Sequence, residues 1–88
     1  MSLSPAERQF IIQERLQKIF LPTHLEVIDD SAQHVGHAGA SSGAGHYTVI
    51  IASECFNHKS RVAIHREIYQ ILQDLIPVEI HALQINVL

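Results

Sequence analysis

The sequence predicts an α+β domain in which a three-stranded sheet carries helices on one of its faces. Two segments show the apolar spacing of amphipathic helices, and three show the alternation or β-branched content of strands. Their order is helix, strand, strand, helix, strand. Elements with one apolar side bury that side against each other in two layers. With 88 residues, the chain has the length of one domain, which we expect to span residues 1–88.

The first helix is predicted to begin after Ser4 and to end near Phe20. Ser4, Pro5 and Glu7 have the spacing of a capping box with proline at the first helical position. Apolar residues then recur at helical spacing: Ile12, Leu16, Ile19 and Phe20. Pro22 restricts the residue before it and so ends the helix.

Two strands separated by a long loop come next. Alternation predicts a strand over His24–Asp29, with Leu25 and Val27 on one face. β-branched residues predict a second strand over Tyr47–Ala52, paired antiparallel with the first. The segment Ser31–Gly45 between them contains all four glycines of the chain. Loops longer than about 12 residues in compact domains are usually functional or disordered.

The last two elements are a helix and a strand. Ser60 caps the predicted second helix, and Pro77 follows its end. Its buried stripe is expected to consist of Ile64, Ile68, Ile71 and Leu75. Alternation predicts the third strand over His81–Val87. One of its faces is expected to hold His81, Leu83, Ile85 and Val87.

The totals exclude several classes of protein. A net charge of −3 gives no general attraction to nucleic acid. The single cysteine, Cys55, forms no internal disulfide and supplies no four-thiolate metal site, and we expect it to be a small buried apolar residue. The absence of an 18-residue apolar run or a signal-peptide pattern predicts a cytoplasmic protein that does not contact a membrane.

Histidine is the unusual component, with seven copies, four of them between Thr23 and Tyr47. Imidazole serves as a metal ligand, a proton carrier or a polar surface group. From the residues alone, a packed or surface role is favoured for His81, and a solvated role for the loop histidines His34 and His37. The others are expected to be structural or peripheral: His46 structural, His65 partly buried, His24 and His58 exposed.

Several short stretches match one known family in order and spacing. They are Leu25–Ser31, His37, Gly45–Tyr47, Ser53, Phe56, Lys59–Ser60, His65–Arg66 and Ile80–Leu83. Over nearly its whole length the chain resembles the BolA family. The resemblance implies a fold similar to a type II KH domain, in agreement with the order of elements predicted above.

The resemblance also implies a partner and a cofactor. BolA-like proteins pair with monothiol glutaredoxins, and the heterodimer holds a bridging [2Fe-2S] cluster used in iron–sulfur trafficking and iron regulation. By this resemblance His81 is one cluster ligand, and a histidine of the loop is the second. His37 fits that position best, with His34 and His46 as alternates. Imidazole replaces thiolate on one iron of such clusters elsewhere.

A nucleic-acid-binding regulator is the alternative hypothesis, because some bacterial BolA-like proteins are treated as DNA-binding regulators. The residues that would contact phosphate are at the turn and start of the second helix: Lys59, Ser60, Arg61 and Arg66. Ile64 stands where many relatives have arginine, which reduces the basic character of this helix. An enzyme is not expected, because the sequence offers no nucleophile–base pair, paired catalytic carboxylates or phosphate loop.

Overall fold

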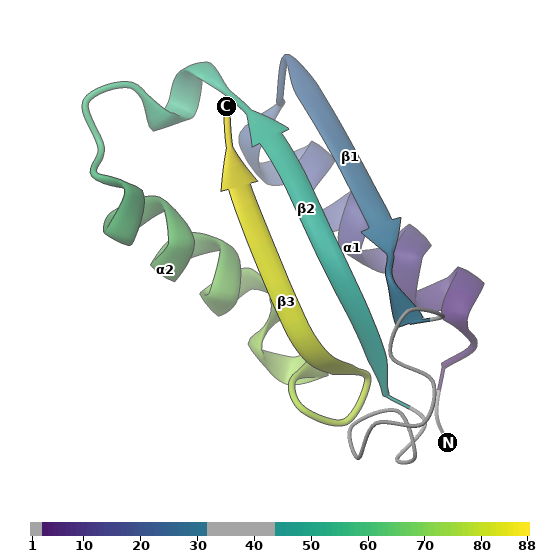
Figure 1. Cartoon of the computed structure of the whole chain (residues 1–88). Helices are drawn as coiled ribbons and strands as arrows, with labels where there is room; N and C mark the ends of the chain where they lie inside the picture. Colours follow the sequence, from purple (N-terminus) through teal and green to yellow (C-terminus); the bar gives the residue numbers. More distant parts are fainter. Residues whose placement is uncertain (1–2, 32–43) are drawn as a thin grey trace.

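The computed structural model describes residues 3–31 and 44–88, which form a three-stranded mixed sheet with two helices on one face (Figure 1). The elements are α1 (Pro5–Phe20), β1 (His24–Asp29), β2 (Gly45–Ala52), η3 (Glu54–Phe56), α2 (Arg61–Leu72), η4 (Gln73–Leu75) and β3 (Ile80–Val87). This arrangement confirms the predicted fold class and order of elements. Neither helix in the described part of the chain has the length and apolar character needed to span a bilayer.

Strand β2 is the centre of the sheet. It pairs antiparallel with β1, as predicted, and parallel with β3. Parallel neighbours need a crossover connection, and α2 supplies it here (Figure 1). Tyr47 lies opposite Asp29 on one side and Leu83 on the other.

Helix α1 starts and ends where its sequence signals place it. Ser4 and Glu7 form the capping box, and Leu21 follows the last turn in a left-handed conformation with φ of 45°. The buried row of α1 consists of Arg8, Ile12, Leu16 and Phe20. Ile19 shares the apolar spacing of this row in the sequence, but its side chain is 53% exposed. Each step of four residues rotates the row by about 40°, so in the last turn Phe20 occupies the covered position and Ile19 points outward.

Helix α2 covers the remainder of the same face. The Ser60 hydroxyl accepts a hydrogen bond from the backbone N–H of Ala63 at 3.1 Å and caps the helix. The predicted stripe is largely confirmed: Ile64, Ile68, Leu72 and Leu75 are buried, and Ile71 packs against them. Leu75 belongs to η4, because the α-helix ends at Leu72.

The core lies between the helices and the inner face of the sheet. Alternate strand residues point into it: Val27, Tyr47, Val49, Ile51 and Ile85. Val49 and Ile51 are fully buried at the centre of β2. This pattern places the odd-numbered residues of β2 in the core, so His46 lies on the opposite face.

The start of β3 departs from simple alternation. Gly45 pairs with Ile80, whereas the next residue, His46, pairs with Ala82. Strand β3 therefore has one extra residue, His81, at this irregularity, as in a β-bulge. The prediction that His81 shares a face with Leu83 was wrong: Ile80 occupies the buried position and His81 is exposed.

Candidate functional site

One end of the sheet brings together three chain segments that are far apart in the sequence. Because β2 is antiparallel to β1 and parallel to β3, the end of β1 lies beside the starts of β2 and β3. Asp29, Gly45 and Ile80 mark the three strand ends. Figure 1 shows this end of the sheet next to the start of α1.

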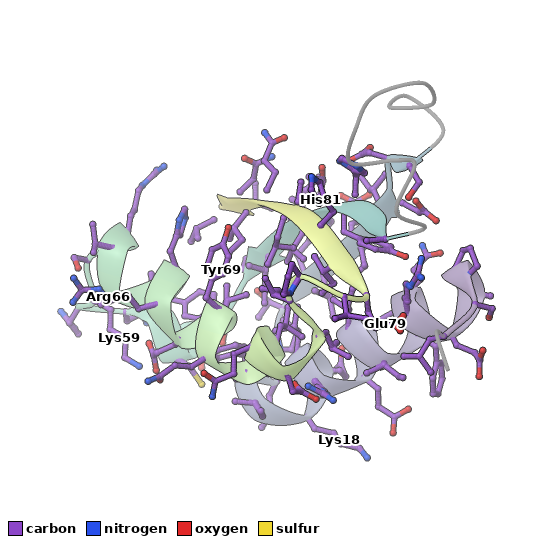
Figure 2. All side chains as sticks on the ribbon, turned by 90° about the horizontal axis from the view of Figure 1, so that it is seen from below. Lys18, Lys59, Arg66, Tyr69, Glu79 and His81 are labelled. Atoms are coloured by element: carbon purple, nitrogen blue, oxygen red, sulfur yellow. The ribbon has the colours of Figure 1, made fainter. Side chains whose placement is uncertain are left out.

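Two histidines meet at this end. The ring centroids of His46 and His81 are 5.2 Å apart, and the ring planes are inclined by 52°. His46 is 7% exposed, whereas His81 is exposed on the surface of β3 (Figure 2). Neutral imidazole is the commonest metal ligand among side chains, so the pair offers one buried and one accessible donor.

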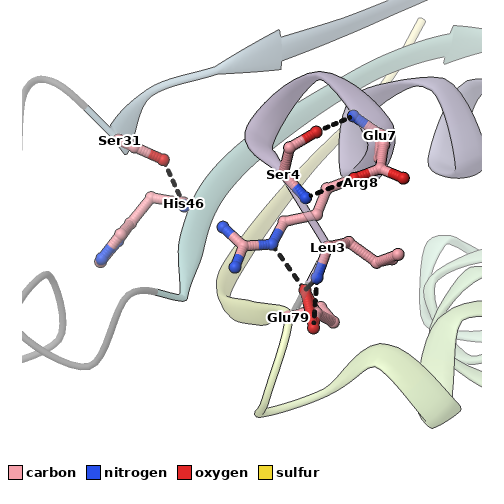
Figure 3. A network of polar contacts seen from close by, with 7 residues as sticks. All are labelled: Leu3, Ser4, Glu7, Arg8, Ser31, His46 and Glu79. Atoms are coloured by element: carbon pink, nitrogen blue, oxygen red, sulfur yellow. Dashed lines mark hydrogen bonds and ion pairs between the residues drawn. The ribbon is translucent and has the colours of Figure 1, made fainter. Parts of the chain in front are cut away.

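The turn after β1 holds the backbone of His46. The N–H of His46 donates to the Ser31 hydroxyl at 3.1 Å (Figure 3). The carbonyl of His46 accepts from the N–H of Asp30 at 2.7 Å. The N–H of Ser31 donates to Oδ1 of Asp29 at 2.9 Å, and Thr48 donates to the carboxylate of Asp30. The Asp-Asp-Ser run is typical of such turns, whose side chains bond nearby backbone.

A shallow hollow adjoins the buried member of the pair. It has a volume of about 170 Å³, and its polar lining includes Asp30, His46, Thr48 and Gln84. All four side chains belong to the outer face of the sheet or its margin, which the helices leave uncovered. The site is therefore a surface feature that suits contact with another molecule.

Beneath the histidines lies a tightly packed inner layer. Tyr47 is 2% exposed, and its ring crosses Gly45 so closely that a Cβ on the glycine would lie 2.3 Å from Cε2 of the tyrosine. Burial raises the pKa of the Tyr47 phenol, with a smaller contribution from the charge of Asp29. Tyr47 is therefore a neutral packing group at neutral pH.

The same layer contains a buried carboxylate, Glu79. Arg8 donates to it from Nε at 2.7 Å, and the N–H of Leu3 donates to both of its oxygens at 3.0 Å (Figure 3). The Arg8 hydrogen bond, followed by that of Leu3, holds the pKa of Glu79 below its ordinary value of 4.5.

Acidification is expected to destabilise the fold through Glu79. A carboxyl with a lowered pKa stabilises the folded chain fully above its unfolded pKa, here 4.5, and loses this effect as pH falls through the folded value. Glu79→Gln is therefore expected to lower Tm at pH 7, and the difference from wild type should shrink below pH 4.5. Thermal unfolding followed by circular dichroism across this pH range measures both Tm values. A Tm difference between variant and wild type that stays constant with pH would contradict the prediction.

The remaining five histidines include two predicted ligands, His34 and His37. His34 and His37 lie outside the described residues. His65 is partly buried, and His24 and His58 are exposed, as expected. Residues 3–31 and 44–88 contain no group of three or more His, Cys, Asp or Glu side chains arranged to hold a metal ion. Of the predicted ligands, the structure thus brings together His46 and His81.

The expectation for Cys55 was wrong. Its side chain is exposed in η3, with Sγ 3.5 Å from the carbonyl oxygen of Phe20. Phe56, the next residue, fills the buried position and packs its ring 4.9 Å from that of Phe20. Cys55 follows the far end of β2, so it is remote from the histidine pair.

The predicted phosphate-contacting residues are close together but unequally available. Lys59 pairs with both oxygens of Glu67 at 2.9 and 3.0 Å, and the hydroxyl of Ser60 caps α2. Arg61 and Arg66 are exposed and make no ion pair with any described residue. Two of the four residues thus have internal partners.

Comparison with known proteins adds a family to this geometry. The family of BolA-like proteins matches residues 16–88. SufE-like protein 1 of Arabidopsis thaliana is 44% identical over 79 residues, covering 84% of this chain. This chain spans only 21% of that relative's length. The DNA-binding transcriptional regulator BolA of Escherichia coli is 35% identical over 75 residues, which are 85% of this chain and 69% of that protein.

Solved structures agree with the sequence comparison. The BolA domain of SufE1 from Arabidopsis thaliana superposes with a TM-score of 0.79 at 40% identity. The match covers 98% of this chain and 93% of that one. The similarity therefore extends over both helices and the whole sheet.

Proposed function

This chain belongs to the BolA-like protein family, and from that premise we propose that it binds a monothiol glutaredoxin and shares a [2Fe-2S] cluster with it. In this proposal the chain is an adaptor or regulator of cluster delivery and not an enzyme. The observation that carries the proposal is the contact between the rings of His46 and His81 on the uncovered face of the sheet.

The donor chemistry fits half of such a cluster. Two imidazoles can occupy one iron while thiolates hold the other, and histidine ligation raises the reduction potential relative to an all-thiolate cluster. The only cysteine, Cys55, follows the far end of β2. Eight strand residues span on the order of 25 Å, so thiolate ligands at this site must come from a partner.

His81 is the ligand that we assign first, because its ring is exposed where a partner can reach it. We propose His37 as the second ligand, on the basis of family resemblance. His37 follows Ser31 by six residues, and six residues reach at most about 20 Å, so the chain length permits it to approach His81. His46 and His34 are the alternates, and the ring contact with His81 supports His46.

The test is to mix the protein with a cluster-loaded monothiol glutaredoxin and to record visible absorption and circular dichroism. Wild type is expected to change the cluster spectrum, and His81→Ala is expected to abolish the change. If His37→Ala also abolishes the spectral change while His46→Ala and His34→Ala retain it, His37 is the second ligand. His24→Ala, an exposed histidine at the other end of the sheet, is the matched control.

If wild type leaves the cluster spectrum unchanged and forms no complex with the glutaredoxin on size-exclusion chromatography, the cluster proposal is wrong. An unchanged spectrum with a stable complex would retain the glutaredoxin partner and remove the shared cluster.

Nucleic-acid binding is the second candidate, supported by the name of the Escherichia coli relative. Here Arg61 and Arg66 would contact phosphate, because Lys59 and Ser60 already have internal partners. Each phosphate contact on duplex DNA contributes about −0.9 to the slope of log affinity against log salt. Arg61→Ala/Arg66→Ala is therefore expected to reduce the slope by about 2. Fluorescence anisotropy with a labelled DNA duplex at several salt concentrations measures this slope. Tight binding by wild type with a salt slope that the double variant leaves unchanged would contradict this assignment.

A further inference from the structure

A buried ion pair lies at the same end of the fold as His46 (Figure 3). Arg8 belongs to α1, and Glu79 immediately precedes β3. Nε of Arg8 is 2.7 Å from Oε2 of Glu79, and the two side chains are only 6% and 9% exposed. Glu79 stands two residues before His81 in the chain.

Stability alone does not account for this pair. Arg8 begins the row that continues with Ile12, Leu16 and Phe20, so an apolar side chain would extend the core at this position. Removing two charges from water is expensive, and well-packed apolar replacements of buried ion pairs are often neutral or stabilising. The pair therefore calls for an explanation in terms of geometry.

Glu79 is the point where three segments are joined. Its carboxylate accepts from Arg8 and from the N–H of Leu3 at the start of α1. Its backbone carbonyl accepts from the N–H of Gly45 at 2.9 Å, and its own N–H donates to the carbonyl of Leu75 at 2.8 Å. One residue thus ties α1, the start of β2 and the end of η4 together.

These attachments lie next to the irregularity in β3. The ladder pairs Gly45 with Ile80 and then His46 with Ala82, so His81 is the extra residue between two paired positions. Regular pairing does not determine the position of a bulged residue, which depends on what anchors the chain on either side. Before His81 the anchor is Glu79, which Arg8 holds from beneath the sheet.

We propose that the Arg8–Glu79 ion pair is a positioning device that maintains the bulge and so keeps the ring of His81 beside that of His46. The functional importance of this device rests on the proposed role of His81 as a cluster ligand. The geometric part of the inference concerns the metal-free chain and stands independently of any cluster.

The test uses the full chain in its metal-free form. The readout is the NOE between ring protons of His46 and His81, recorded with the ring nitrogen shifts of both. Arg8→Met keeps an unbranched apolar stem and removes the charged guanidinium, and it is expected to abolish the NOE while circular dichroism shows a folded protein. Arg8→Lys restores a cation and is expected to recover part of the NOE intensity.

The matched control is Arg15→Met on the same helix. Arg15 forms an ion pair with Asp74 at 2.6 Å, in which neither Arg8 nor Glu79 takes part. Arg15→Met removes this ion pair and should leave the NOE between the histidine rings unchanged. A loss of the NOE in Arg8→Met alone would then be specific to the Arg8–Glu79 pair. If Arg8→Met fails to fold, Glu79→Gln decides the question, because it removes the charge at nearly constant size.

The cluster assay then separates the two proposals. With glutaredoxin-held cluster, folded Arg8→Met is expected to lose the spectral change that wild type gives. A folded Arg8→Met or Glu79→Gln with an unchanged ring NOE and ring shifts would overturn the positioning role. If wild type leaves the cluster spectrum unchanged while the variants still lose the NOE, the proposed function fails and the positioning of the histidine pair stands.

Discussion

Gly45→Ala is expected to lower the free energy of unfolding by about 1–3 kcal/mol, the usual cost of overpacking a core. The new Cβ would lie 2.3 Å from Cε2 and 2.7 Å from Cζ of the Tyr47 ring. A flexible surface side chain would turn away, but Tyr47 is 2% exposed and surrounded by core residues. The start of β2 must therefore shift, which also disturbs the adjacent His46. Urea unfolding followed by circular dichroism measures the loss.

A double-mutant cycle identifies the ring as the cause. In a Tyr47→Leu background the clashing ring is absent, so Gly45→Ala should cost less than in wild type, with a coupling of roughly 0.5–3 kcal/mol between contacting sites. Equal costs in the two backgrounds would show that the glycine is required for another reason, such as its backbone conformation.

Ile68→Ala is expected to cost about 2–5 kcal/mol, as large-to-small substitutions at fully buried positions do. Ile68 is completely inaccessible and lies in the middle of α2, where it belongs to the main core cluster. Small domains are stable by only about 5–15 kcal/mol in total, so this single change removes a large share of the stability. The measurement is equilibrium unfolding at 25 °C.

Val62→Ala on the same helix is the control. Val62 is 61% exposed, and surface substitutions usually change stability by no more than about 0.5 kcal/mol. Both variants alter helix propensity in the same direction, so the contrast isolates burial. Comparable losses at the two positions would mean that the core assigned to α2 is wrong.

The helices and strands of this fold are predictable because each one carries its own local sequence signal. Ser4 and Ser60 mark the helix starts through side-chain caps that depend only on neighbouring residues. The antiparallel pairing of β1 with β2 follows from their adjacency in the chain. Apolar spacing alone does not show that Ile19 is exposed, because the buried row of α1 turns around the helix axis and places Phe20 against the core in the last turn.

The site was less predictable because non-local contacts create it. The face on which His81 lies depends on an extra residue in β3 relative to β2, and no signal within β3 announces that pairing. Arg8 and Glu79 are 71 positions apart, so their ion pair has no local pattern. A charged residue at the head of an apolar helical row, such as Arg8 before Ile12, was the only available hint. The resemblance to a family, and not the residues alone, predicted the importance of His81.

The parallel pairing of β2 with β3 makes this site dependent on the completed fold. The two histidines are 35 positions apart, and they become neighbours only after α2 has crossed over and β3 has joined the central strand. Non-local parallel pairing of this kind forms slowly compared with local contacts. A nascent or partly unfolded chain therefore lacks the histidine pair even when α1, β1 and β2 are already in place. A partner that recognises the pair would select completed molecules and pass over unfinished ones.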